Sequence, residues 1–236
     1  MIYKTIISAD ELRKNIDNKD FIIFDSRCDI KDQGYGIDSY TEGHIPNSIF
    51  VDIDNDLASE KQPGTGRHPL PNVDMFCEKL SHWGMSNNKQ VVIYDDAGGA
   101  FAGRMWWMMK WLGHDLVAVL DGGVNSWVKE GNKLVTSPTI FEKSYFEPNV
   151  RNDMIAQVSD VEEAQFKMNT ILLDARSKER YDGLNDPVDP VAGHVPGAIS
   201  HPLGNNLDRT SKFRSKEELI HNFGKISQEL NTKEII

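Results

Sequence analysis

The chain has 236 residues and a formal net charge of −10, with 39% hydrophobic and 26% charged residues. These values are typical of a folded protein with one large domain or two domains of about 110 residues, and they argue against disorder. The acidic surface would repel nucleic acid, and no stretch approaches the roughly 20 apolar residues of a membrane span, so we expect neither a nucleic acid nor a membrane partner.

The N-terminal residues contain no apolar run followed by a cleavage site, which favours a cytoplasmic location. The first predicted helix begins at Ser8, because Ser8 and Glu11 form a Ser-x-x-Glu capping box. Uniformly apolar runs then predict strands buried on both faces of a parallel sheet, at residues 21–25, 90–95 and 116–121. The helices predicted around these strands cover residues 72–83, 104–109 and 124–130. This alternation predicts an α/β fold, with a mostly parallel sheet flanked by helices.

The pattern of the first half begins again about 150 residues later. Ser159 and Glu162 form a second Ser-x-x-Glu sequence, and a strand at 171–174, a helix at 216–223 and a strand from residue 233 are predicted after it. An Asp-x-Arg motif and a Gly-His-x-Pro motif occur in both halves: Asp25-Ser26-Arg27, Gly43-His44-Ile45-Pro46, Asp174-Ala175-Arg176 and Gly193-His194-Val195-Pro196.

The repeat predicts two tandem domains. The first covers residues 1–131, and the second covers residues 158–236 and is incomplete at its C-terminal end. Residues 132–157 contain prolines and scattered charges, which are typical of a linker.

A glycine-rich loop at residues 96–103 follows the predicted strand at 90–95 and leads into a helix. In parallel α/β sheets such loops bind ligands, because their backbone N–H groups and the helix N-terminus favour an anion or a thiolate. Here the place of a nucleophile is taken by Asp95, or by Asp96, and the loop contains no cysteine. A carboxylate cannot accept and release a sulfur atom, so we expect this loop to be catalytically silent. The same segment excludes a cysteine phosphatase.

Several motifs together carry a resemblance to a known family. They are the repeated Asp-x-Arg and Gly-His-x-Pro motifs, Val92-Ile93-Tyr94-Asp95-Asp96, Arg104-Met105-Trp106-Trp107-Met108, and Leu120-Asp121-Gly122-Gly123 with Trp127. In this order, over nearly the whole chain, they resemble the two-domain rhodaneses, which are thiosulfate and 3-mercaptopyruvate sulfurtransferases. The resemblance implies two rhodanese-like domains, of which the first is silent and carries an aspartate at the nucleophile position, as Asp95 does.

The resemblance implies that the second domain transfers the sulfur. A cysteine there takes a sulfane sulfur from thiosulfate or 3-mercaptopyruvate as a persulfide and passes it to cyanide or a thiol, without a cofactor or a metal. In the family this cysteine opens the loop after the third strand, which by the repeat lies about three residues beyond Ile236. We therefore expect a truncated chain that contains no catalytic residue and is inactive as printed. The implied partners are a small anionic sulfur donor, with both donors left open, and a thiol or cyanide acceptor.

The resemblance also implies binding residues. Arg180 lies shortly after Asp174 and resembles the family's substrate-binding arginine, whose guanidinium holds a sulfonate or a carboxylate through two hydrogen bonds. The alternative for Arg180 is a surface salt bridge. Asp54 and His68 resemble an Asp/His pair that lines the family's cleft, where a histidine can move protons near neutral pH. The alternative for His68 is a hydrogen-bonded loop histidine.

We expect structural roles for the remaining histidine, Asp-x-Arg and cysteine residues. His44 and His194 occur in equivalent motifs, so we expect each to fix a turn by hydrogen bonding, and we expect each Asp-x-Arg motif to form an ion pair at a strand end. Cys28 lies outside the glycine-rich loop and Cys77 lies on the apolar face of a helix, so both are expected to be structural. A non-catalytic rhodanese-like binding module stays open as an alternative function from another class.

Overall fold

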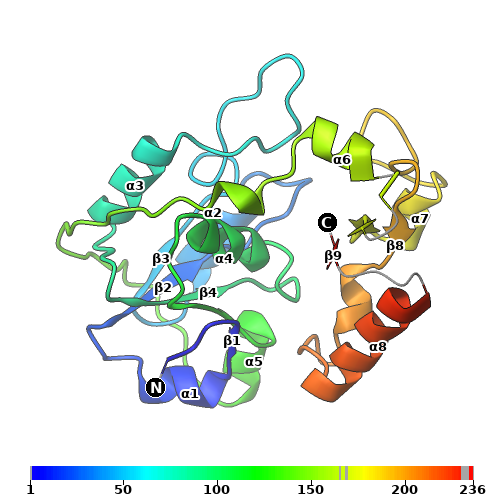
Figure 1. Ribbon diagram of the computed structural model, residues 1–236. Coiled ribbons are helices and arrows are strands. Elements are labelled where there is room, and N and C mark those ends of the chain that lie inside the picture. Colours follow the sequence, from blue (N-terminus) through cyan, green and yellow to red (C-terminus); the bar gives the residue numbers. More distant parts are fainter. Residues whose placement is uncertain (1, 165, 168–169, 230–233, 236) are drawn as a thin grey trace. The chain divides into compact units, whose positions relative to one another are not determined.

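The protein consists of two compact units, Met1–Asn152 and Asp153–Ile236 (Figure 1). The computed structural model describes residues 2–164, 166–167, 170–229 and 234–235. Within these residues, no helix has the length and apolar character that crossing a membrane requires.

The first unit is built on a parallel sheet of five strands in the order β1-β5-β4-β2-β3. These strands are β1 (Ile6–Ile7), β2 (Phe21–Asp25), β3 (Ser48–Phe50), β4 (Gln90–Tyr94) and β5 (Val117–Leu120). Every residue of β2, β4 and β5 is buried, which confirms the prediction from the uniformly apolar runs. The sequence patterns did not predict β3, because so short a strand gives no periodic signal.

The helices of the first unit are α1 (Ala9–Lys14), α2 (Tyr35–Glu42), α3 (Val73–His82), α4 (Ala102–Trp111) and α5 (Gly123–Lys129). The predicted capping box is present in α1, where the Ser8 hydroxyl accepts from the Glu11 N–H and the Glu11 carboxylate accepts from the Ser8 N–H. The helices predicted at 72–83 and 124–130 are confirmed as α3 and α5. Helix α4 begins earlier than the predicted residue 104, and α2 was not predicted.

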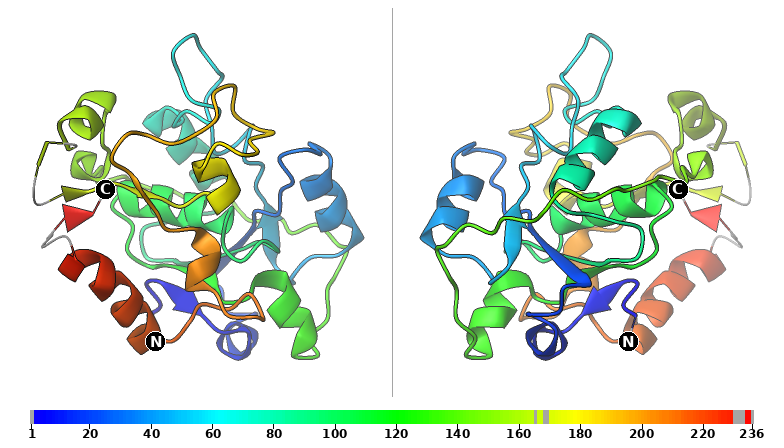
Figure 2. Two further views of the ribbon diagram at one scale, coloured as in Figure 1. Left: turned by 90° about the vertical axis from the view of Figure 1, so that its right-hand side faces the viewer. Right: turned by 90° about the vertical axis from the view of Figure 1, so that its left-hand side faces the viewer.

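Helices α1 and α5 lie side by side and cover one face of the sheet (Figure 2). Leu12 of α1 and Val124 and Trp127 of α5 belong to one hydrophobic cluster. The strand residues in this cluster are Ile7, Phe21, Ile23, Val92, Tyr94, Ala118 and Leu120. Side chains alternate along a strand, so Phe24 points to the other face, where its ring meets Trp83 edge to face with centroids 5.6 Å apart.

Tyr94, the last residue of β4, joins three parts of the first unit through its buried hydroxyl group. The hydroxyl donates to Oδ2 of Asp25 at 2.6 Å and accepts from the backbone N–H of Ile45 at 3.1 Å. Its oxygen also lies 3.0 Å from Oγ of Ser48. The ends of β4, β2 and the turn before β3 are therefore fixed to one another.

After α5 the chain returns along the first unit with little regular structure. Val135 and His44 exchange two backbone hydrogen bonds of 2.9 Å. The Phe146 side chain is buried, and Arg151 forms an ion pair with Asp115 at 2.8 Å. Residues 132–152 thus pack as part of the first unit.

The second unit contains shorter elements. Its helices are α6 (Val158–Ala164), α7 (Lys178–Tyr181) and α8 (Lys216–Glu229), with a 3-10 turn, η2, at Leu203–Asn206 and another, η1 (Asn152–Met154), at the unit boundary. Its strands are β6 (Thr170–Ile171), β7 (Leu173–Asp174), β8 (Ile199–Ser200) and β9 (Glu234–Ile235). The helix predicted at 216–223 is confirmed and extends to Glu229. β9 lies in the strand predicted from residue 233, while Lys233 and Ile236 lie outside the described residues.

Two predictions for the second unit are wrong in detail. Ser159 does not cap a helix, because α6 already begins at Val158 and the Asp160 carboxylate accepts the Gln157 N–H at 2.7 Å. The run 171–174 is not one strand: β6 pairs in parallel with β9, and β7 pairs in parallel with β8. Leu172 separates the two short strands.

Candidate functional site

The loop after β4 is closed around the side chain of Asp95, which is 1% exposed. Its Oδ1 accepts hydrogen bonds from the backbone N–H groups of Ala97 at 3.0 Å and Gly99 at 2.9 Å. Its Oδ2 accepts from those of Phe101 at 2.9 Å and Ala102 at 3.0 Å, the latter at the start of α4. The four N–H groups form a cradle for an anion, and the carboxylate of the chain itself fills it.

The backbone of Asp95 leaves no room around the start of α5. The Val124 N–H donates to the Asp95 carbonyl oxygen at 3.0 Å, and a Cβ atom on Gly123 would lie 2.0 Å from that oxygen. Gly123 has a φ of +57°, so only glycine suits this position. Of the two candidate aspartates, Asp95 occupies the cradle, whereas Asp96 accepts a hydrogen bond from the Tyr35 hydroxyl.

The structure brings Asp54 and His68 together. Nε2 of His68 lies 3.0 Å from Oδ1 of Asp54 in the loops between β3 and α3. The guanidinium of Arg104 on α4 holds these loops, because it donates to the Leu57 carbonyl at 2.6 and 3.1 Å and to the His68 carbonyl at 3.0 Å. The pair therefore has a fixed place near the N-terminal end of α4.

Opposing effects act on the His68 imidazole. Burial lowers the pKa of His68 below its ordinary value, and the positive charges of Arg104 and Arg67 act in the same direction. The Asp54 carboxylate raises this pKa but does not outweigh burial. The neutral imidazole is favoured, which can accept a proton.

Arg180 lies in a cluster of charges in the second unit. Its Nε donates to Asp186 at 3.1 Å, and its terminal nitrogen donates to Asp189. Arg176 reaches the same two carboxylates, at 3.3 Å for Asp186 and 3.6 Å for Asp189. The structure therefore places Arg180 in salt bridges within the second unit, and the residue patterns of the sequence had not singled out Asp186 and Asp189.

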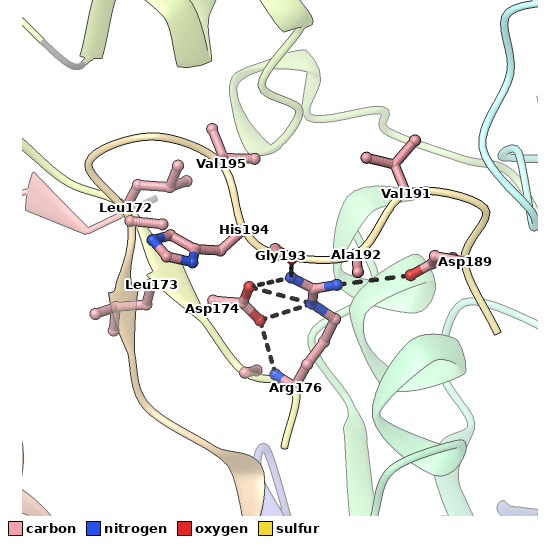
Figure 3. Close-up of a pocket in the computed structure, with 12 residues that line it drawn as sticks. Leu172, Leu173, Asp174, Arg176, Asp189, Val191, Ala192, Gly193, His194 and Val195 are labelled. Atoms are coloured by element: carbon pink, nitrogen blue, oxygen red, sulfur yellow. Dashed lines mark hydrogen bonds and ion pairs between the residues drawn. The ribbon is translucent and has the colours of Figure 1, made fainter. Parts of the chain in front are cut away.

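Arg176 also forms the predicted ion pair with Asp174 at the end of β7. Its Nε lies 3.0 and 3.1 Å from the two carboxylate oxygens, and its terminal nitrogen lies 2.6 Å from Oδ2. Figure 3 shows this guanidinium between Asp174 and Asp189 at the edge of an open pocket of about 520 Å³. In the first unit, Arg27 holds Asp25 with the same spacing, which confirms both predicted ion pairs.

The two Gly-His-x-Pro histidines have structural roles, as predicted. Nδ1 of His44 lies 2.7 Å from the Tyr40 carbonyl oxygen, and its Nε2 lies 3.0 Å from that of Ser137. Nδ1 of His194 lies 2.7 Å from the Tyr181 carbonyl oxygen. Each imidazole also stacks on the tyrosine whose carbonyl it contacts, with ring centroids 3.8 and 3.7 Å apart.

Neither cysteine has the surroundings of a nucleophile. Burial together with Asp54, Asp52, Asp29 and Asp96 raises the pKa of Cys28 to about 11. Burial and then Asp74 raise the pKa of Cys77 to about 11. Nucleophilic cysteines are thiolates with a lowered pKa, so both thiols stay protonated at neutral pH. Across the described part of the chain, no group of three or more His, Cys, Asp or Glu side chains is arranged to hold a metal ion.

The known proteins that this chain matches are rhodanese-like domains and sulfurtransferases. The rhodanese-like domain family matches residues 8–130. A probable 3-mercaptopyruvate sulfurtransferase of Pseudomonas aeruginosa is 36% identical over 220 residues, which cover 92% of this chain and 78% of the relative. The thiosulfate sulfurtransferase of Bos taurus is 33% identical over 187 residues, which cover 76% of this chain and 61% of the relative.

A solved structure agrees with these sequence relatives. The crystal structure of SseA from Escherichia coli matches with a TM-score of 0.82 and 26% sequence identity. Its printed description refers to the rhodanese fold and to the catalytic mechanism of 3-mercaptopyruvate sulfotransferases. The match covers 94% of this chain and 84% of SseA.

We predict that Asp95→Asn destabilises the first unit by about 3 kcal/mol, because the amide NH₂ group would face N–H donors that the carboxylate now satisfies. Urea denaturation would measure the change in the free energy of unfolding. Asp17→Asn, at an exposed position, serves as the control and should change it little. Equal stability of the two variants would show that the cradle does not depend on the carboxylate.

We predict that Asp54→Asn lowers the pKa of His68 further, because it removes the one carboxylate that raises this pKa. The imidazole titration can be followed by NMR. Asp56→Asn removes a neighbouring carboxylate that is paired with Lys79 at 2.8 Å, and should leave the His68 midpoint in place. A rise in the midpoint in Asp54→Asn would contradict the contact.

Proposed function

Because this chain belongs to the rhodanese-like family of thiosulfate and 3-mercaptopyruvate sulfurtransferases, we propose that it serves in moving a sulfane sulfur from one of these donors to a thiophilic acceptor. The observation that carries the proposal is the Asp95 cradle. It has the geometry of a thiolate- or anion-binding loop, and a carboxylate of the chain occupies it. Such a loop is the silent counterpart of a catalytic loop.

The proposed chemistry has two steps. A cysteine thiolate attacks the outer sulfur of thiosulfate, so that a Cys–S–S bond forms, the S–S bond of the donor breaks and sulfite leaves. With 3-mercaptopyruvate the thiolate attacks the thiol sulfur, the C–S bond breaks, and the pyruvate enolate leaves and takes up a proton to give pyruvate. The acceptor then attacks the outer sulfur, which gives thiocyanate from cyanide or a persulfide from a thiol and restores the thiolate. Neither step uses a metal ion or an organic cofactor.

We assign neither of the two cysteines as this thiolate. Both Cys28 and Cys77 have pKa values raised to about 11, and neither lies in a loop with converging N–H donors. Cys28 is also surrounded by carboxylates, which repel a thiolate and an anionic donor alike.

Donor binding is assigned to Arg180, whose guanidinium suits the charged end of either donor. In this structure its terminal nitrogen is bound to Asp189, whose side chain is partly exposed. An anionic donor would exchange with that carboxylate. Asp54 and His68 are assigned to the same reaction as a neutral proton acceptor and its orienting partner.

The alternative function, a non-catalytic rhodanese-like binding module, is also supported by the Asp95 cradle. In this alternative the chain would bind a peptide or an anion without chemistry, because Asp95 fills the cradle and both thiols are protonated. The two functions differ in whether sulfur is transferred at all.

We predict that the 236-residue chain forms no thiocyanate from cyanide with either donor above the level of a Cys28→Ser/Cys77→Ser double variant. The reason is the protonated state of both thiols at neutral pH. Colorimetric thiocyanate assays would measure this. Formation that disappears in Cys28→Ser alone would refute our assignment of the cysteines.

We predict that Arg180→Gln weakens thiosulfate binding about tenfold, because a charge-assisted pair of hydrogen bonds is lost. Arg180→Lys keeps the positive charge but cannot form the paired hydrogen bonds of a guanidinium, so it should have an intermediate effect. Titration calorimetry or NMR on the intact chain gives the dissociation constants, with Arg13→Gln as the exposed control. Unchanged affinity in Arg180→Gln would remove Arg180 from the donor site.

A further inference from the structure

Residues 141–151 lie near the end of the first unit and form neither a helix nor a strand, and we call them the return segment. The segment passes beside α3 and reaches the ends of α3 and α4 (Figure 1). At Gly84, just after α3, a Cβ atom would lie 2.7 Å from Cβ of Phe141. At Gly113, just after α4, a Cβ atom would lie 2.3 Å from the carbonyl oxygen of Asn149. The segment therefore packs directly on the backbone at both helix ends.

The return segment depends on contacts near its two ends and on one buried side chain. The Ser144 N–H donates to the Ser81 carbonyl oxygen at 2.8 Å. The Asn149 N–H donates to the Leu112 carbonyl oxygen at the same distance. Of the side chains in this segment, only that of Phe146 is buried. Segments with so little buried apolar surface open locally at a lower free energy than a central sheet.

A buried histidine lies under the return segment. His114, in the turn between α4 and β5, is 4% exposed, and its Nε2 lies 3.1 Å from the Leu116 carbonyl oxygen. The Phe146 ring meets this imidazole edge to face, with the ring centroids 5.9 Å apart. The proposed sulfur transfer makes no use of His114. The buried side chain of the return segment thus packs on a group that can take up a proton near neutral pH.

Burial lowers the pKa of His114 below its ordinary value of 6.5. The backbone carbonyl groups of Leu116 and Lys89 and the Asp115 carboxylate raise this pKa, but they do not outweigh burial. The Lys110 ammonium group lowers it further. At pH 7 the imidazole is therefore neutral while the segment is docked.

The other charged side chains of the return segment are Glu142, Lys143, Glu147 and Arg151. Arg151 pairs with Asp115 at 2.8 Å, and Arg151 and Lys110 hold the pKa of Asp115 far below its ordinary value. This carboxylate therefore stays ionised at pH 5. Lys143 lies 3.4 Å from Nε2 of His82, an exposed histidine, and both glutamates are exposed. The Lys89 ammonium group lies 5.7 Å from the centre of the Phe141 ring.

We infer that the return segment is a pH-sensitive strap, which opens from α3 and α4 when His114 takes up a proton. The neutral imidazole packs beside Phe146, whereas an imidazolium in the same place would be a buried charge without enough water. Opening the strap hydrates this charge and leaves the sheet intact. Because the second unit begins at Asp153, opening also lengthens the covalent link between the two units. This inference does not depend on sulfur transfer.

The direction of the pH effect follows from linkage. The open form binds a proton more tightly, because its imidazole has the ordinary pKa and the docked imidazole has a lower one. Docking is therefore at full strength above about pH 6.5 and weakens as the pH falls below that value.

Hydrogen exchange of the intact chain tests this at single amides. Protection factors, which are corrected for the intrinsic pH dependence of exchange, would be compared at pH 7 and pH 5. We expect the protection of the Ser144 and Asn149 amides to fall about fivefold at pH 5, and that of the amides of β2 and β4 to stay. Equal protection of the two segment amides at both pH values would overturn the inference, and so would a parallel loss in β2 and β4.

Two histidine variants assign the proton. In His114→Gln the protection of the return segment should be the same at both pH values, whatever its absolute level. His82→Gln removes the exposed histidine beside Lys143 and should keep the fivefold change. A pH dependence that persists in His114→Gln, or that disappears in His82→Gln, would contradict the role of His114.

A reciprocal test changes the strap and follows the histidine. Phe146→Ala removes the buried side chain of the return segment, so the pKa of His114 should rise towards its ordinary value in an NMR titration. Tyr145→Ala removes the neighbouring aromatic side chain, which is 72% exposed, and should leave the midpoint in place. An unchanged or lower midpoint in Phe146→Ala would show that the strap does not cover His114. These results are separable from the thiocyanate assay, because none involves a sulfur donor.

Discussion

The first unit depends on a carboxylate that is buried and hydrogen-bonded at the end of β2. Asp25 is inaccessible to solvent, and removing a carboxylate from water is costly unless strong partners replace the water. Arg27 supplies three donors, its backbone N–H and two side-chain nitrogens, and Tyr94 a fourth, while Arg27 also donates to the Gly43 carbonyl. Because Tyr94 is held in this way, the next residue, Asp95, enters the loop in a fixed position.

The next residue after Tyr94 is also a carboxylate that is buried and hydrogen-bonded. Asp95 is a second buried carboxylate, and it is satisfied by backbone N–H groups instead of an arginine. The N–H group of Ala102 would otherwise be a buried donor without a partner, and the other three N–H groups are partly buried, so the carboxylate and the loop stabilise each other. A loop of this shape that carried a thiolate would leave its sulfur reactive. With a carboxylate it becomes a structural element.

The sequence predicted those parts that depend on local pattern. The buried strands β2, β4 and β5 followed from apolar runs, and α1 followed from its capping box, because the signal lies within a few residues. A salt bridge was the alternative for Arg180, but its partners did not follow from the sequence, since Asp186 and Asp189 reach Arg180 through the fold of a loop. The hydrogen bonds of the Tyr94 hydroxyl could not be predicted from the sequence either. Their partners Asp25, Ile45 and Ser48 come together only through strand pairing and the turn before β3.

The acidic character of the chain limits how it can bind an anionic donor. With a net charge of −10, long-range electrostatics oppose the approach of the donor, so binding must come from local positive charge. Arg176 and Arg180 supply that charge, but Asp174, Asp186 and Asp189 already compensate it. Asp174 is held by Arg176 in a bidentate pair, whereas Asp189 is half-exposed and more readily hydrated. At the donor site that we propose, binding at Arg180 would exchange one carboxylate for another anion, and its strength would depend on how easily Asp189 returns to water.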